Sequence, residues 1–349
     1  MTVGFVSSNY LGTALLPAVG QADLQLTKLQ TESASGQYAD LGLQLGGQSG
    51  YELSLRNADD LLQTVSTSNT MVNGRLTTAS DALSSILTTA KSTQSTLVAW
   101  TPYGAASGDV AVTGDDALQS LAASANSSYG GDYVFGGINT ATAPMASYTS
   151  SSPAATALQS AFQTQFGCLP SDAAAASISS TAMTSFLAGA FDDQFTGANW
   201  TSNWSSASSV NSTAEVAPGQ TVTSTASLNS GGFADLAQGY AMLSMLGGSE
   251  LSSGAQQSVV TAATNLLTTG ISSLTSTAAG IGQTQDVIKQ ADDDMTTQMT
   301  LLQTQLGGLD NVNQEQVSTQ LTTLTTQIEA AYQITAQLQK LSLAQYLPA

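Results

Sequence analysis

The sequence has 349 residues, only 9% of them charged, and its 24 acidic and six basic side chains give a net charge of −18 at pH 7. So acidic a chain is a poor partner for nucleic acid or an anionic membrane surface. Its apolar runs are also shorter than the 18 or more residues that span a bilayer. Because histidine is absent, the commonest general base and metal ligand is missing. We therefore expect no nucleic-acid binding, no membrane insertion, no cofactor and no enzymatic activity.

Cys168 is the single cysteine, so no internal disulfide can form. Without a histidine to activate its thiol, we interpret it as a small buried or tip residue rather than a nucleophile. No basic residue precedes Lys28, and no small-residue cleavage site follows an apolar core near the start of the chain. A Sec-type signal peptide is not indicated, and export would need another route.

The first predicted helix covers residues 17–35, where Val19, Ala22, Leu26 and Leu29 follow heptad spacing. Pro17 is compatible with it only in the first turn, where a missing N–H costs nothing. Residues 36–50 contain five glycines and are predicted to be a connector.

A long helix is predicted from Leu55 to Trp100, ending before Pro102. Its apolar residues recur in alternating steps of three and four, which is the spacing of a coiled-coil seam. Asn69 and Gly74 interrupt this seam and are expected to have structural roles. The seam residues that we expect to be buried are Leu62, Val72, Leu76, Leu83, Ile86 and Leu97.

The middle of the chain loses the heptad pattern. A short helix is predicted at 115–128, and a short strand or turn at Tyr133–Phe135. Residues 154–166 and 172–191 are predicted helices, and 198–228 with Pro218-Gly219 resembles a β-hairpin. We expect residues 139–232 to form a separate, surface-facing domain.

Heptad spacing resumes after residue 233, with a capping box at Ser253 and Gln256. Gly307-Gly308 is predicted to end this second long helix, and Asn313 with Gln316 to start the last one. The second long helix is expected to bury Val260, Leu267, Leu274, Ile281, Ile288 and Leu302, and the last helix carries Val317, Leu321, Leu324, Ile328, Leu338 and Leu341.

The order of elements is nearly palindromic, so the two long helices can pair antiparallel and bring the two ends of the chain together. The predicted fold is mainly α: an elongated antiparallel coiled-coil rod built by the N- and C-terminal parts, with a central α+β outer domain. The predicted divisions are a terminal helix and connector (1–50), two halves of the rod (51–138 and 233–306), the outer domain (139–232) and a last helix (307–349).

Four segments carry a family resemblance through their order along the chain. They are Leu29–Gly36, Tyr38–Gly42 with Ser54–Arg56, Gly131–Gly137 with Pro144, and Gln327–Leu347. Together they resemble the bacterial flagellin superfamily, closest to the α-proteobacterial type of its hook-associated protein 3 branch, the hook–filament junction protein.

This resemblance implies a structural protein of the extracellular flagellum, exported unprocessed through the flagellar type III apparatus. It also implies a homo-oligomeric helical ring whose neighbours are another hook-associated protein and flagellin, and an export chaperone. The terminal helices would supply the assembly interface, through Val19, Ala22, Leu26, Leu29, Val317, Leu321, Leu324, Ile328, Leu338 and Leu341.

Alternatives remain open at this point. The terminal helices could form an isolated hairpin, but Ala, Ser and Thr dilute both seams, which favours burial by neighbouring subunits. The chain could be flagellin itself, or a secreted coiled-coil adhesin that binds through residues 145–232. Asp292-Asp293-Asp294 could attract a cation, but consecutive helix positions point apart, so a solvated face is expected.

Overall fold

The computed structural model describes residues 8–99 and 107–346, which fall into two compact units. We call Met1–Gln63 with Thr296–Ala349 the terminal unit, and Thr64–Met295 the central unit. The helices α3 (Ser49–Ala99) and α9 (Ser253–Asp310) contribute residues to both. None of the helices in the described ranges is long and apolar enough to cross a bilayer.

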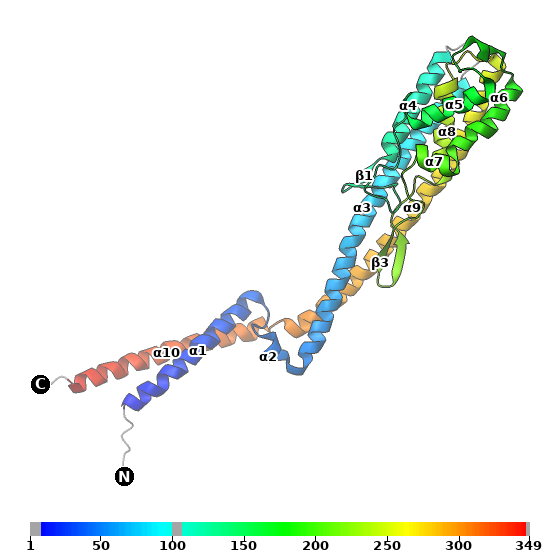
Figure 1. Cartoon of the computed structure of the whole chain (residues 1–349). Coiled ribbons are helices and arrows are strands. Elements are labelled where there is room, and N and C mark those ends of the chain that lie inside the picture. Colours follow the sequence, from blue (N-terminus) through cyan, green and yellow to red (C-terminus); the bar gives the residue numbers. More distant parts are fainter. Residues whose placement is uncertain (1–7, 100–106, 347–349) are drawn as a thin grey trace. The chain divides into compact units, whose positions relative to one another are not determined.

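In the terminal unit, α1 (Ser8–Ser35) and α10 (Gln314–Tyr346) lie side by side (Figure 1). The connector after α1 contains the short helix α2 (Leu41–Leu45) and the 3-10 turn η1 (Gly46–Gln48). The Asp40 carboxylate caps α2 by accepting the Leu43 N–H at 2.9 Å. The predicted connector is therefore ordered, and it leads directly into α3.

The central unit surrounds parts of α3 and α9 with shorter elements (Figure 1). Its two antiparallel strand pairs are β1 with β2 and β3 with β4. In the second, Thr213 pairs with Thr223 and Ala217 with Gln220, with an irregularity between Glu215 and Ala217. The elements are α4 (Ser107–Ala125), β1 (Ser128–Tyr129), β2 (Asp132–Tyr133), α5 (Pro153–Phe166), η2 (Ala173–Ser177), α6 (Ser180–Phe186), η3 (Leu187–Phe191), η4 (Asp192–Phe195), α7 (Gly197–Asn203), β3 (Thr213–Ala217), β4 (Gln220–Thr223) and α8 (Gly231–Leu246).

The two long helices run antiparallel. In the central unit, Gln285 contacts Thr77 at 3.0 Å, and Gln94 contacts Thr268 at 2.8 Å. In the terminal unit, the Tyr51 hydroxyl donates to Gln305 at 3.2 Å. Of the predicted seam, Val72 and Leu302 are half-buried, and the residues buried in the structure are Leu62, Leu76, Leu83, Ile86, Leu97, Val260, Leu267, Leu274, Ile281 and Ile288. Trp100 and Pro102 lie outside the described residues.

The core of the central unit is organised around α8. Most of this helix is buried, including Phe233, Leu236, Tyr240 and Leu243, while Asp235 and Ser244 lie on a half-buried face. It packs closely on α9 because Gly270 leaves room for Leu236, whose Cδ2 would lie 2.8 Å from a Cβ at that position. Gly270 is therefore required for the close packing of α8 on α9.

The middle segment shares this core. Phe162, Phe191 and Trp204 belong to the same apolar cluster as Leu76 and Leu274 of the long helices. Much of the apolar surface of this segment is therefore buried against α3, α8 and α9. The hydrophobic effect stabilises contact between apolar faces whatever the sequence spacing of their apolar residues.

Several predicted boundaries are wrong. Pro17 lies inside α1, which already begins at Ser8, because the proline ring interrupts one helical hydrogen bond without preventing those before and after it. The helix predicted at 172–191 is split into η2, α6 and the π-helical η3. The predicted fold class is confirmed: long helices at both ends of the chain, with a small α+β region between them.

The ends of α9 also differ from the prediction. Ser252 rather than Ser253 caps its start, since the Ser252 Oγ accepts the Ala255 N–H at 3.3 Å. At its other end α9 passes through Gly307-Gly308 and continues to Asp310. Tertiary contacts of Asp310 outweigh the cost of two helical glycines, which is about 1 kcal/mol each.

Candidate assembly interface

The residues predicted for assembly lie mainly between α1 and α10. Leu29 and Val317 are each 5% exposed and form a small cluster with Val312, against which Leu321 and Leu324 pack. Ile328 is also buried, and Val19, Ala22 and Leu26 are half-buried. The side chains of Leu338 and Leu341 lie outside the described residues. Much of the predicted interface is thus the internal seam of a helical hairpin.

Backbone hydrogen bonds connect the segment that follows α1 to the segment that precedes α10. The Tyr38 N–H donates to the Asp310 carbonyl at 3.0 Å, and the Val312 N–H donates to the Gly36 carbonyl at 2.9 Å. Gly36 has φ 76°, a left-handed conformation that glycine adopts without strain. The chain therefore turns at both helix ends through paired backbone groups.

Arg56 ties the start of α3 to the end of α9. Its Nη2 lies 2.6 Å from Oδ2 of Asp310, a carboxylate that is almost fully buried, and its Nε donates to Glu52. The hydrogen bond to Glu52 raises the pKa of Arg56 most. Burial, the next largest effect, lowers this pKa, and the charges of Glu52 and Asp310 raise it again, so that the net shift is upward. This ion pair makes the N- and C-terminal halves of the terminal unit depend on each other.

The surface of the terminal unit carries several large apolar or aromatic side chains that are about half exposed or more. Leu24 of α1 is 75% exposed, and Leu43 of α2 is 77% exposed. Monomeric proteins expose single apolar residues routinely, so the number of such residues on this small unit is its distinguishing feature. We call this set the exposed apolar group: Leu24, Leu43, Tyr51, Leu53, Leu61, Leu301, Tyr332 and Ile334.

The central unit is about twice as long yet has fewer such residues among those described. They are Met71, Val98, Val112, Tyr129, Ile138 and Val210. The sequence prediction missed the exposed apolar group because it followed the heptad seam alone. Leu24, Leu53 and Leu61 fall between seam positions, and their apolar character off the seam was the available signal.

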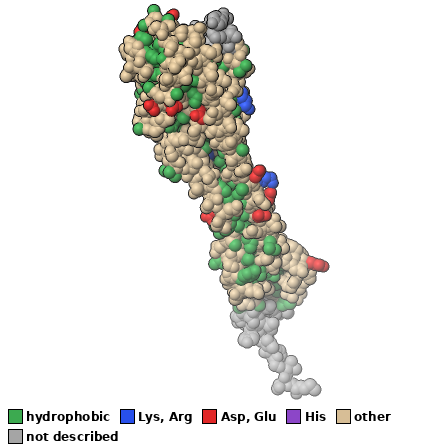
Figure 2. Space-filling view, turned by 90° about the vertical axis from the view of Figure 1, so that its right-hand side faces the viewer, with side chains coloured by type: hydrophobic (Ala, Val, Ile, Leu, Met, Phe, Trp, Pro, Cys, Tyr) green, Lys and Arg blue, Asp and Glu red, His purple; other side chains and the backbone are tan. Residues whose placement is uncertain are grey.

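Most of the basic side chains that the structure describes are paired with acidic ones. Lys28 lies 3.8 Å from Glu32, Arg75 lies 2.6 Å from Asp132, and Lys289 lies 2.8 Å from Asp293. Figure 2 shows a face on which charged side chains are sparse and acidic groups are more frequent than basic ones.

Asn69 connects a strand to the two long helices. Its Nδ2 lies 2.8 Å from the Val216 carbonyl of β3 and 2.8 Å from the Asp292 carboxylate. The expected solvated acidic face is therefore only partly solvated, because Asp292 is used in this buried contact. No group of three or more candidate metal ligands occurs among the described side chains.

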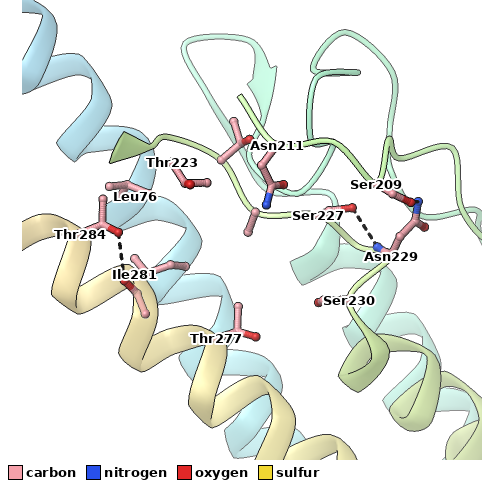
Figure 3. Close-up of a pocket in the computed structure, with 13 residues that line it drawn as sticks. Leu76, Ser209, Asn211, Thr223, Ser227, Asn229, Ser230, Thr277, Ile281 and Thr284 are labelled. Atoms are coloured by element: carbon pink, nitrogen blue, oxygen red, sulfur yellow. Dashed lines mark hydrogen bonds between the residues drawn. The ribbon is translucent and has the colours of Figure 1, made fainter. Parts of the chain in front are cut away.

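A cavity of about 460 Å³ opens in the central unit between the long helices and the middle segment (Figure 3). Thr277, Ile281 and Thr284 of α9 line one side, and Asn229 and Ser227 line the other. No acidic or basic side chain lines it, and the Asn229 Oδ1 already accepts from the Trp200 indole at 2.9 Å. Neutral hydroxyls and amides without a base cannot perform acid–base or nucleophilic chemistry.

Comparison with known families matches both ends of the chain. The bacterial flagellin N-terminal helical region matches residues 6–140. The bacterial flagellin C-terminal helical region matches residues 264–347. The two matched stretches contain α1, α3 and α10 and most of α9. Comparison with curated proteins finds no match.

Proposed function

The chain belongs to the bacterial flagellin superfamily, whose members are structural subunits of the extracellular flagellum, and we propose that it forms the hook–filament junction. In this role, copies assemble into a helical ring through the terminal unit, between hook-side and filament-side neighbours. The partners proposed are another hook-associated protein and flagellin. The protein acts by joining two assemblies and performs no chemical turnover.

The observation that carries this proposal is the exposed apolar group on the terminal unit. Its own core is small, with Leu29, Val312 and Val317 as the buried cluster between α1 and α10. Covering Leu24, Leu43 and Tyr332 with a neighbouring copy would remove apolar surface from water, at about 25 cal/mol per Å². Assembly would therefore stabilise the terminal unit, which has the larger number of exposed apolar residues in the monomer.

The same surface bears on export. We propose passage through the flagellar type III apparatus without a cleaved signal peptide, followed by assembly outside the cell. A chaperone that covers the exposed apolar group before export would prevent early association, since such patches drive aggregation.

Flagellin, the filament subunit, is the second candidate, because the two matched regions belong to flagellins in general. A deletion strain separates the two roles: a junction protein is needed for hooks to carry filaments, even when flagellin is made. Hooks that still carry filaments would reject the junction role. Purified protein that grows long filaments alone would favour flagellin.

Complementation of the deletion strain with point variants tests whether the junction role depends on the exposed apolar group. Leu24→Asn should restore export but not filament attachment, because Leu24 belongs to the exposed apolar group. Val112→Asn is the matched control, since Val112 is an exposed apolar residue of the central unit. Equal motility of both variants would argue against assembly through Leu24.

The adhesin alternative needs a different test from deletion of residues 145–232. Those residues share the core with the long helices, so their removal would unfold the central unit. Point substitutions on the surface of the central unit are the appropriate probe, and one candidate binding site is described next.

A further inference from the structure

Two glycines bring α4 and α8 into close contact. A Cβ on Gly114 would lie 2.4 Å from the Ser244 nitrogen, and a Cβ on Gly247 would lie 2.8 Å from Cγ1 of Val110. Both separations are too short for any other residue without movement of a helix. Because of this close approach, the Ser244 hydroxyl donates a hydrogen bond to the Asp115 carboxylate across the helix pair.

A cavity of about 620 Å³ opens beside this contact, entirely within the central unit. Its size falls in the range of small-molecule sites. Asp115 and Gln119 are one helical turn apart on α4 and line it together, and Gln159 of α5 also lines it. Neither glutamine side chain has a hydrogen-bond partner among the described residues. Two amides and a carboxylate are thus available to a ligand.

Tyr148 adds an aromatic wall. Its ring stacks on Trp204 with centroids 5.5 Å apart and an angle of 7° between the planes. Burial raises the pKa of Tyr148, the Asp115 charge raises it further, and a hydrogen bond with Ser244 lowers it. A tyrosine hydroxyl is protonated at neutral pH and can donate a hydrogen bond.

We propose that this cavity binds a neutral saccharide. Sugar hydroxyls both donate and accept, so they can donate to the Asp115 carboxylate and accept from the glutamine amides, while the ring packs beside Tyr148. Anionic ligands are disfavoured, because no basic residue lines the cavity and none occurs between Lys91 and Lys289. The inference is independent of the junction role.

Saturation-transfer NMR on the full chain tests the proposal with glucose, galactose, mannose and N-acetylglucosamine at up to about 20 mM, a range suited to millimolar affinities. We expect at least one neutral sugar to bind. Asp115→Asn should weaken it by about tenfold through loss of a charged hydrogen-bond acceptor. Gln159→Leu should also weaken binding, because it removes an amide that lines the cavity without altering Asp115.

Two variants serve as matched controls. Asp116→Asn makes the same chemical change at the next residue of α4, which does not line this cavity. Gln163→Leu makes the Gln159→Leu change one turn further along α5, at a residue that does not line this cavity. Both should bind like the unmodified protein, with melting temperatures of all four variants measured to verify folding.

Three results would overturn the proposal. One is the absence of binding by every neutral sugar, and another is equal binding by folded Asp115→Asn and Asp116→Asn proteins. The third is preference for a cationic amine such as glucosamine over its neutral N-acetyl form, which would indicate simple attraction to the Asp115 charge. N-Acetylneuraminic acid, an anionic sugar, should not bind.

Discussion

The central unit buries its aromatic and aliphatic residues in one continuous core, whereas the terminal unit leaves many of its large apolar residues at the surface. Phe162 and Trp204 are almost fully buried in the first, while Leu24 and Leu43 are mostly exposed in the second. The same chain thus contains one unit that completes its own core and one that needs additional surface to do so. This contrast is the basis of our proposal that assembly uses the terminal unit.

The pairing of α1 with α10 differs in kind from the packing around α8. The α1–α10 seam consists of single aliphatic residues diluted by Ala, Ser and Thr. Around α8, glycines allow backbones to approach, and aromatic rings such as Phe135 and Phe233 pack edge to face at 5.2 Å. Dense packing of this kind resists local opening, and a diluted seam resists it less.

The largest expected effect is on the stability of the central unit. Phe162→Ala should lower the free energy of unfolding by about 3–5 kcal/mol, because Phe162 is fully buried and contacts Phe166 and Phe186. Leu24→Ala should change it by less than about 0.5 kcal/mol. Urea unfolding followed by far-UV circular dichroism, which reports on the helices of both units, measures both. Similar losses in the two variants would remove the contrast between the units.

Amide exchange on the monomer gives the next largest effect. If α1 and α10 fold fully only on assembly, their amides should exchange at least about a hundredfold faster than those of α8, a difference of about 2.7 kcal/mol. In assembled protein the protection of α1 and α10 should rise toward that of α8. Equal protection of all three helices in the monomer would contradict coupled folding and assembly.

The long helices could be predicted from sequence because their signal is local. Leu76, Leu83 and Leu274 repeat at heptad spacing, and each is buried in the structure. Helical periodicity requires knowledge only of neighbours three and four residues away. The seams of α1 and α10 were located by the same spacing.

Other features depended on residues far apart in the sequence. Gly114 is needed because of Ser244, and Gly270 because of Leu236, so neither role could be inferred from neighbouring residues. The continuation of α9 beyond Gly307 depends likewise on Asp310, which contacts Arg56. To predict the exposed apolar group, one must know which helix faces are already covered by other elements.

Salt should have a moderate effect on assembly. With a net charge of −18 and most described bases paired within the chain, copies repel one another at long range. Raising ionic strength to 0.1 M shortens the screening length to about 10 Å, which weakens this repulsion more than apolar contact. Sedimentation should therefore show stronger association at high salt. The reverse trend would indicate attractive charge pairs between copies.

The smallest expected effect concerns Asp235 of α8. Burial, and then the nearby charge of Asp192, raise the pKa of Asp235 in the folded protein. The folded state therefore holds this proton more tightly than the unfolded state, and ionisation destabilises the fold at pH values above the folded pKa. Asp235→Asn should raise stability at pH 7, by no more than about 1 kcal/mol.

That gain should shrink as the pH falls through the folded pKa of Asp235, and vanish below its ordinary value of 3.8, where both states are protonated. Urea unfolding at a series of pH values measures the difference between the two proteins. Asp293→Asn provides a control on α9, where the carboxylate is exposed beside Lys289 and should give no gain at neutral pH. An Asp235→Asn gain that is independent of pH would show that the effect is not one of ionisation. In that case ionisation of the half-buried Asp235 carboxylate would cost no free energy of folding, and Asp235 would not contribute to the dependence of stability on pH.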